Sequence, residues 1–193
     1  MCRFSHRDYF RKFKVGVGEY GEILVEVAFG GQKKGDWQPG FDIAVKYEDF
    51  EKTLRKKTEA TEEQIKAFLS STGGKQTRIE VKSKLFKMDE VGVVDCGQVQ
   101  FDGKRKNRPP VPYMTHMAIV FVPPGERRNG KADEEGEVDR AFLITLETAG
   151  SLRTGKNKNI SGAKLRSALK DRRDDFVDIT RLLRDAAESS VVD

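Results

Sequence analysis

The sequence predicts an α+β fold that is rich in β-structure, with mostly antiparallel sheets, one helix in the middle of the chain and a helical C-terminal segment. Many short segments alternate apolar and polar residues, which is the period of half-buried strands. One strong helix-capping pattern interrupts these segments before residue 155. Because too few helical segments separate the strands for a repeating βαβ architecture, the prediction is α+β.

The N-terminal part of the chain is expected to form an antiparallel meander of three strands. Residues 9–17 alternate apolar and polar side chains, and residues 23–29 repeat the pattern. The glycine-containing segment 18–21 would turn the chain between them. Residues 41–47 alternate again, so the three predicted strands would share one apolar face.

A helix is predicted next, after a charged segment at 48–58 that we expect to form a short helical turn. Thr61 and Gln64 have the spacing of a capping box, in which the Thr hydroxyl accepts from the Gln amide and the Gln side chain reaches back. The apolar residues between 65 and 69 share one helical face. Glycines at 73–74 are expected to end the helix.

The second half of the chain returns to strands. Residues 79–85 alternate, and short apolar runs follow between 91 and 101. Residues 114–122 are apolar on both faces, which is typical of a central strand covered on two sides. A charged hairpin loop is predicted at 126–139, and residues 141–146 form the last predicted strand.

The C-terminal segment differs in character from the rest of the chain. A polar, basic linker at 156–159 is followed by Ser161, which is suited to cap a helix. Apolar residues then recur at helical spacing towards the C-terminus. We therefore expect a β-rich α+β domain at 1–154 and a basic linker with a helical segment at 155–193.

Composition limits the class of protein. The chain has 193 residues, a formal net charge of +5 and 35% charged residues. A basic chain of this size favours nucleic acid, an acidic protein or an anionic membrane surface as its partner. No apolar run approaches the length of a membrane span, so we expect no membrane-spanning segment. Of these partners we expect nucleic acid and not a membrane.

Cysteine usage predicts the compartment. Cys2 and Cys96 are far apart and no CxxC pair occurs, which argues against a zinc finger or a redox motif. Free thiols favour a reducing, cytoplasmic location. The N-terminal residues are rich in arginine, so mitochondrial import is the alternative that we consider less favoured.

Two basic loops, at 30–40 and 103–113, each combine lysines or arginines with an aromatic ring. Cations neutralise phosphates, and flat rings stack on unpaired bases. We therefore expect a non-enzymatic protein that binds single-stranded DNA or RNA with low sequence specificity, and that has no catalytic residues, metal or other cofactor. A stripe on the strand at 79–85 extends the predicted surface, whose residues are Lys33, Lys34, Trp37, Arg78, Lys82, Lys84, Lys104, Arg105, Lys106, Arg108 and Tyr113.

One segment resembles a known family. GEILVEV at 21–27, a basic loop, QPGFDIAV at 38–45 and DFEKTL at 49–54 follow one another in that order. This order resembles the single-stranded-DNA-binding core of transcriptional-coactivator and Whirly-type proteins. The resemblance implies a strand, a basic turn, a second strand and a helix that form a unit whose curved sheet grips an unpaired strand. It implies that Lys33, Lys34 and Trp37 lie near that strand.

A structural role is the first alternative. An antiparallel core with long charged hairpins suits packing in a viral or phage particle or another large complex. Trp37 would then be an interface anchor, because Trp is enriched at interfaces. Under either interpretation we expect a homo-oligomer or a larger assembly.

A metal-dependent nuclease is the second alternative. The sequence Ile79-Glu80-Val81-Lys82 matches the E-x-K half of such a site, in which a carboxylate and a lysine flank one metal and its water. The partner acid should come from the neighbouring strand, and Asp42 is the best candidate.

Two further patterns in the sequence bear on chemistry. Residues 150–157 nearly spell a phosphate-binding P-loop, but Asn157 replaces the Ser or Thr that would bind magnesium. An anion-binding turn without hydrolysis is the more plausible interpretation. His116 lies in an apolar strand, and we interpret it as a core histidine with satisfied hydrogen bonds.

Overall fold

A six-stranded sheet forms the centre of the protein. The computed structural model describes residues 17–33, 41–74, 76–85, 87–88, 94–95, 98–100, 114–122, 127–128, 131–132, 140–153 and 159–189. The strand order is β1-β2-β3-β7-β10-β12, and every neighbouring pair is antiparallel except β3 and β7. The predicted α+β class with a mostly antiparallel sheet is therefore confirmed. The six strands are β1 (Gln32–Lys33), β2 (Ile43–Val45), β3 (Thr77–Leu85), β7 (His116–Val122), β10 (Arg140–Thr145) and β12 (Val177–Asp178).

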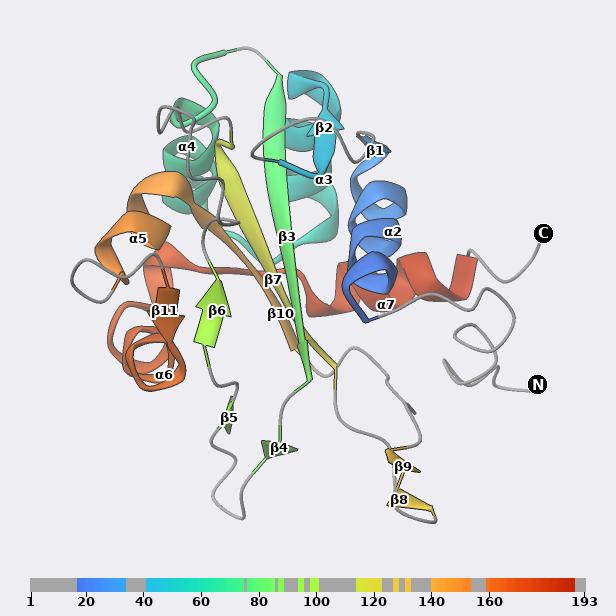
Figure 1. The fold of residues 1–193 in the computed structure, drawn as a ribbon. Coiled ribbons are helices and arrows are strands. Elements are labelled where there is room, and N and C mark those ends of the chain that lie inside the picture. Colours follow the sequence, from blue (N-terminus) through green and yellow to red (C-terminus); the bar gives the residue numbers. More distant parts are fainter. Residues whose placement is uncertain are drawn as a thin grey trace, which may run out of the picture.

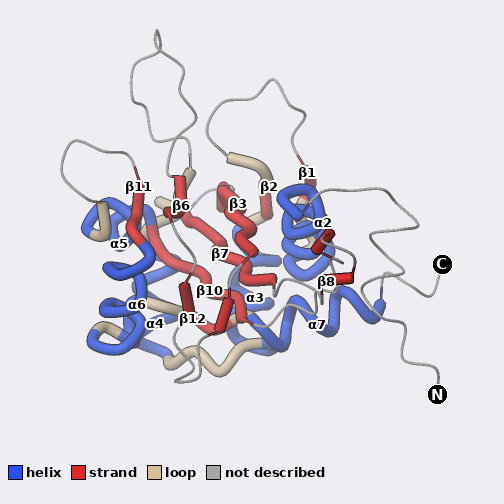
Figure 2. Tube along the Cα trace, turned by 60° about the horizontal axis from the view of Figure 1, so that its bottom comes forward, coloured by secondary structure: helices blue, strands red, loops and turns tan. Residues whose placement is uncertain are grey.

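Helices cover both faces of this sheet (Figures 1 and 2). Four helices pack on one face, and buried side chains from each of them enter the same apolar cluster. They are α2 (Val17–Phe29), α3 (Tyr47–Lys57), α4 (Glu62–Ser70) and α7 (Thr180–Ser189). Two helices, α5 (Leu146–Ser151) and α6 (Gly162–Asp171), pack on the other face.

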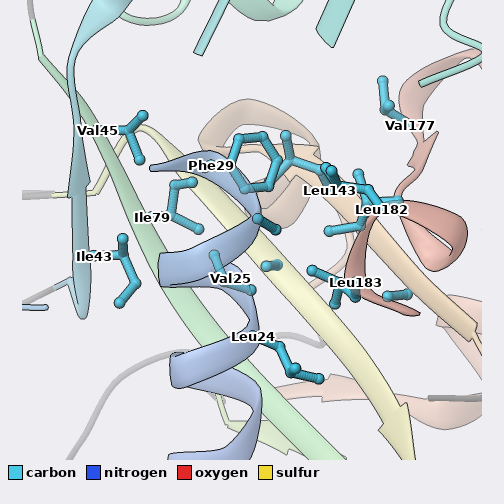
Figure 3. Close-up of a cluster of buried hydrophobic side chains, with 14 of the residues drawn as sticks. Leu24, Val25, Phe29, Ile43, Val45, Ile79, Leu143, Val177, Leu182 and Leu183 are labelled. Atoms are coloured by element: carbon cyan, nitrogen blue, oxygen red, sulfur yellow. The ribbon is translucent and has the colours of Figure 1, made fainter. Parts of the chain in front are cut away.

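The two apolar clusters follow from strand alternation. In β7, Ala118 and Val120 belong to the cluster under the four helices, whereas Ile119 and Phe121 belong to the cluster under α5 and α6. Successive side chains in a strand point to opposite faces, so this central strand is buried on both sides as predicted. Figure 3 shows part of the first cluster, in which side chains of α2 and α7 pack against the sheet.

The strand predicted at 23–29 was wrong, because this segment belongs to helix α2. Its buried residues are Tyr20, Leu24, Val25, Ala28 and Phe29, which recur every three to four residues. The alternation had placed Leu24 and Ala28 on a polar side, and it had placed Val27, which is 44% exposed, on the apolar side. The neighbouring strand expected at 9–17 lies outside the described residues apart from Val17, which begins α2.

The middle of the chain contains two helices rather than one. The segment expected to form a short turn is the 11-residue helix α3. The capping box is confirmed, since Thr61 accepts from the Gln64 amide and the Gln64 side chain accepts from the Thr61 amide. Gly73 and Gly74 have φ angles of 64° and 70°, which non-glycine residues rarely adopt, and they follow the helix as predicted.

The remaining strands are short. They pair as β4 (Lys87–Met88) with β5 (Val94–Asp95), β8 (Arg127–Arg128) with β9 (Lys131–Ala132), and β6 (Gln98–Gln100) with β11 (Asn159–Ser161). The rest of the predicted hairpin at 126–139 lies outside the described residues. Ser161 caps α6 by accepting from the Lys164 amide, as the sequence predicted.

The C-terminal segment contributes to both clusters. Leu165 and Phe176 lie in the cluster under α5 and α6, and Leu182 and Leu183 lie in the other. Strand β12 adds to the edge of the main sheet beside β10. None of the helices in the described ranges is long and apolar enough to span a membrane.

Candidate active site

Asp42, which directly precedes β2, lies close to Glu80 on β3. The ladder between β2 and β3 ends with Ile43 paired to Ile79, and Asp42 and Glu80 are the next residues of the two segments. The charge of Glu80 acts on the carboxyl group of Asp42. Ile79 and Val81 point into the cluster under the four helices, so the alternation along β3 places Glu80 on the other face of the sheet.

Asp42 is held at the start of β2 by two hydrogen bonds to β3. Its amide donates to the Ile79 carbonyl at 2.9 Å, and its Oδ2 accepts from the Val81 amide at 2.7 Å. The side chain of the preceding residue, Phe41, packs against the cluster under α5 and α6. Within the described part of the chain, the second carboxylate oxygen of Asp42 has no hydrogen-bond donor.

The surroundings of Asp42 disfavour its ionised form. Burial and the negative charge of Glu80 raise the pKa of Asp42 from 3.8 to about 6. The charge of Glu22 on α2 raises it further, whereas the Val81 hydrogen bond and the charge of Lys82 lower it. Glu22 from α2 and both Glu80 and Lys82 from β3 therefore act electrostatically on Asp42.

Glu80 and Lys82 share one face of β3 and form an ion pair. Their side chains are 12% and 24% exposed, so the pair is partly shielded from water. On the neighbouring strand β7, Met117 and Ile119 are the register partners of Glu80 and Lys82, and both are buried under α5 and α6. The charged side chains of Glu80 and Lys82 on β3 therefore lie directly beside the apolar cluster under α5 and α6.

Glu22 is held by strand β1. The ammonium group of Lys33 lies 2.9 Å from Glu22 Oε2 and 3.7 Å from a carboxylate oxygen of Glu19. The Lys33 amide also donates to Glu26 Oε1 at 2.8 Å. The acidic side of α2 is therefore joined to the edge of the sheet through one lysine.

Two carboxylates are a donor set that a hard divalent cation can use. No group of three or more His, Cys, Asp or Glu side chains in the described ranges is arranged to hold a metal ion by itself. Mg²⁺ does not need such a cage, because it keeps several waters and binds through one or two carboxylates plus substrate phosphates. A cation between Asp42 and Glu80 would also relieve the repulsion that raises the pKa of Asp42.

The basic surface predicted from the sequence is only partly visible. Arg78, Lys82 and the backbone of Lys84 lie in β3, where Arg78 shares a face with Glu80 and Lys82. Lys33 is on β1, and both Lys33 and Lys82 are paired with carboxylates. The other predicted residues, which are Lys34, Trp37, Lys104, Arg105, Lys106, Arg108 and Tyr113, lie outside the described residues.

His116 is a core residue, as predicted. It is fully buried, and burial lowers its pKa to about 3, so the ring is neutral. Its Nε2 lies 3.1 Å from the Phe68 carbonyl, an acceptor, which assigns the proton to Nε2. The ring stacks on Phe68 and packs against Phe50.

The P-loop-like segment does not have the arrangement that its sequence suggested. Gly150 and Ser151 are the last residues of helix α5, so a helix and not a strand precedes the loop. Residues 154–157 lie outside the described residues. The phosphate-binding motif requires a strand directly before the loop. In the described residues, helix α5 occupies that place.

A pocket of about 480 Å³ lies between the end of α3 and the start of α7. Its lining mixes four cations with three acids and includes none of the residues around Asp42. These lining residues are not arranged in a way that suggests catalysis. The lining residues are Lys56, Lys57, Thr58, Glu59, Asp178, Thr180, Arg181, Leu182, Arg184 and Asp185.

No protein-family model and no curated protein matches this chain. The resemblance to Whirly-type proteins stays a prediction. Sequence reasoning had paired Glu80 and Lys82 with Asp42, but it missed Glu22, because a strand was expected where α2 lies. The helical spacing of Glu19, Glu22 and Glu26 was the available signal for an acidic helix face.

Proposed function

We propose that this protein is a divalent-cation-dependent nuclease that hydrolyses phosphodiester bonds in nucleic acid. The observation that carries the proposal is that Asp42, bonded to the Val81 amide, lies close enough to Glu80 to feel its charge, with Lys82 paired to Glu80 on the same strand. The geometry thus favours the nuclease, which the sequence alone had ranked below a non-enzymatic binding protein.

The two carboxylates would hold the cation. Asp42 is oriented by the Val81 amide, and Glu80 is oriented by its ion pair with Lys82. A bound Mg²⁺ would act as a Lewis acid on the phosphodiester and would lower the pKa of an attacking water. The oxygen-only donor set favours Mg²⁺ or Mn²⁺ over Zn²⁺.

Lys82 would stabilise the charge that builds up on the phosphate. Its ammonium group is partly shielded from water, and a charge placed in such a site acts more strongly than one in bulk water. When a cation neutralises Glu80, Lys82 becomes available to donate to a phosphate oxygen or to the attacking water.

A nucleic-acid substrate is supported by the charge of the chain. The net charge is +5, and the basic loop with Trp37 immediately precedes Asp42 in the sequence. Lysines and an aromatic ring that are close to Asp42 in the sequence favour a polyanion with stacked bases over a small phosphate ester. Binding and cleavage would then share one surface.

The test is a cleavage assay on labelled single-stranded DNA, duplex DNA and RNA with Mg²⁺, Mn²⁺ or EDTA. We expect cleavage with either metal and none with EDTA. Glu80→Gln should abolish it, whereas Glu188→Gln, at an exposed position on α7, should not. Cleavage that survives Glu80→Gln, or no cleavage by the parent protein, would overturn the proposal. Binding without cleavage by the parent protein would return the preference to the non-enzymatic role.

A further inference from the structure

The main chain of Arg78 is fixed on both sides of strand β3. Its partner in the ladder with β2 is Ala44. On the other side, the Arg78 amide donates to Thr115 Oγ1 at 2.9 Å, and the Arg78 carbonyl accepts from the Thr115 amide at 2.8 Å. The long side chain of Arg78 therefore starts from a defined point of the sheet.

Arg78 lies on the same face of β3 as the ion pair of Glu80 and Lys82. Ile79 and Val81, which alternate with them, point into the cluster under the four helices. The charged side chains therefore lie on the other face. Two residues along a strand span about 7 Å, so Arg78 and Lys82 start on either side of Glu80 at similar distances.

The guanidinium group of Arg78 lacks an acceptor. In the structure as far as it is described, this group has no hydrogen bond and no ion pair. Its Nε is buried, whereas its two Nη nitrogens are not fully buried. Buried N–H donors are nearly always hydrogen-bonded, because an unsatisfied donor destabilises the folded state. Lys82, by contrast, is paired with Glu80.

We propose that Arg78 binds a phosphate of the nucleic-acid backbone and holds the strand beside the candidate metal site. This inference rests on the nucleic-acid substrate of the proposed function, but it does not require a metal ion. A guanidinium group forms two parallel hydrogen bonds to one phosphate. Because no acceptor holds the group, the side chain can turn its Nε edge towards a phosphate, which would satisfy the buried donor.

The charges on this face support the same role. Glu80 and Lys82 neutralise each other in their ion pair, so Arg78 leaves the three side chains with a net positive charge. The alternative is that the carbon chain of Arg78 only covers apolar surface, as long cationic side chains often do. A methionine at this position would keep that cover and lose the charge, so it separates the two roles.

The test measures binding of a fluorescent single-stranded oligonucleotide in EDTA by anisotropy, at several salt concentrations. Arg78→Met should weaken binding about tenfold or more. The log–log slope of affinity against salt should fall by about 0.7. Arg181→Met removes the same charge from an exposed position on α7, across the sheet, and should change both values far less. Arg78→Lys should restore the slope but only part of the affinity, because lysine lacks the planar fork.

Three results would overturn the proposal. They are parental affinity in Arg78→Met, equal losses in Arg78→Met and Arg181→Met, and no binding by the parent protein. Without nucleic acid, Arg78→Met should not lower the midpoint of thermal unfolding, since it removes an unsatisfied donor. A lower midpoint with a parental salt slope would assign the side chain to packing alone. Should Arg78→Met fold poorly, Arg78→Gln gives the same comparison.

Cleavage assays with Mg²⁺ separate this inference from the nuclease proposal. If the parent protein binds the oligonucleotide through Arg78 but does not cleave it, the metal-dependent function is wrong and the phosphate contact stands. If the parent cleaves and Glu80→Gln does not, while Arg78→Met binds like the parent, only the role of Arg78 is wrong.

Discussion

The carboxylate of Asp42 accepts a hydrogen bond of 2.7 Å from the amide of Val81, which lies 39 residues away in the sequence. Val81 stands between Glu80 and Lys82, so this bond fixes Asp42 relative to both. A backbone amide cannot rotate away, and the position of Asp42 therefore follows from the sheet itself. The predictions below test what this arrangement does for stability and for chemistry.

Asp42→Asn should stabilise the protein and abolish cleavage. The pKa of Asp42 is about 6 in the folded protein, against 3.8 ordinarily, so its ionised form destabilises the folded state at neutral pH. The asparagine keeps an oxygen that can accept from Val81. We expect a gain of about 1–3 kcal/mol at pH 8. Chemical denaturation should show the gain, and a less stable variant would contradict this account.

The pH dependence of that gain has a defined sign. Above pH 6 the carboxylate is ionised in the folded and unfolded states, and its penalty is fully present. As the pH falls from about 6 to 3.8 the folded state takes up the proton first, so the gain from Asp42→Asn should shrink. Asp185→Asn, at an exposed position on α7, is the control and should show no such trend.

His116 should make the protein sensitive to acid. Burial lowers the pKa of this ring from 6.5 to about 3, so its contribution to stability is complete above pH 6.5. Below that pH the unfolded state binds a proton that the folded state does not. The free energy of unfolding should therefore fall by up to about 1.4 kcal/mol per pH unit between 6.5 and 3. His116→Gln should flatten this slope, and an equal slope in urea titrations would contradict the assignment.

Lys82→Met should separate binding from cleavage. The ammonium group faces Glu80 and the phosphate would approach the same place, so its loss should lower kcat by about 10²–10³-fold. Oligonucleotide affinity should change far less, since many cations share the binding. Single-turnover cleavage rates and fluorescence anisotropy would measure the two effects. A Lys82→Met variant with parental kcat would exclude this role.

Gly21 and Ser83 should show strong energetic coupling. A Cβ at position 21 would lie 1.9 Å from Ser83 Oγ, so helix α2 approaches β3 closely at this glycine. The Oγ of Ser83 is buried without a hydrogen-bond partner in the described structure, so Ser83→Ala alone should cost little. Gly21→Ala gains about 1 kcal/mol of helix propensity but meets this clash. We expect it to destabilise the parent protein.

A double-mutant cycle measures that coupling. Gly21→Ala should be at least about 1 kcal/mol more favourable in the Ser83→Ala background than in the parent protein. Thermal unfolding of the four proteins gives the value. Additive effects would show that α2 and β3 are not in close contact at this point.

The sequence correctly predicted those elements whose local residue pattern favours the same structure that the tertiary packing requires. The capping box at Thr61 and the doubly buried strand β7 have patterns that only one structure satisfies. Helix α2 was mistaken for a strand because Ile23, Val25, Val27 and Phe29 also recur every second residue. Only packing against β3 and α7 decides between the two periods.

The candidate site was predicted in part for the same reason. The spacing of Glu80 and Lys82 is local and visible in the sequence, and Asp42 follows from the pairing of neighbouring strands. The role of Glu22 depends on where α2 crosses the sheet, which no local pattern contains. The partners of Lys33 depend on the same crossing.

Helices α3 and α4 connect β2 to β3, and they pack on the face of the sheet opposite Glu80 and Lys82. The chain thus passes Asp42, folds a helical pair on the far side of the sheet, and returns to place Glu80 on β3. Both helices contribute buried side chains to the core, so neither can be removed without loss of stability. The short segment between them belongs to neither helix, and a module inserted there would lie on the side of the sheet away from Glu80 and Lys82.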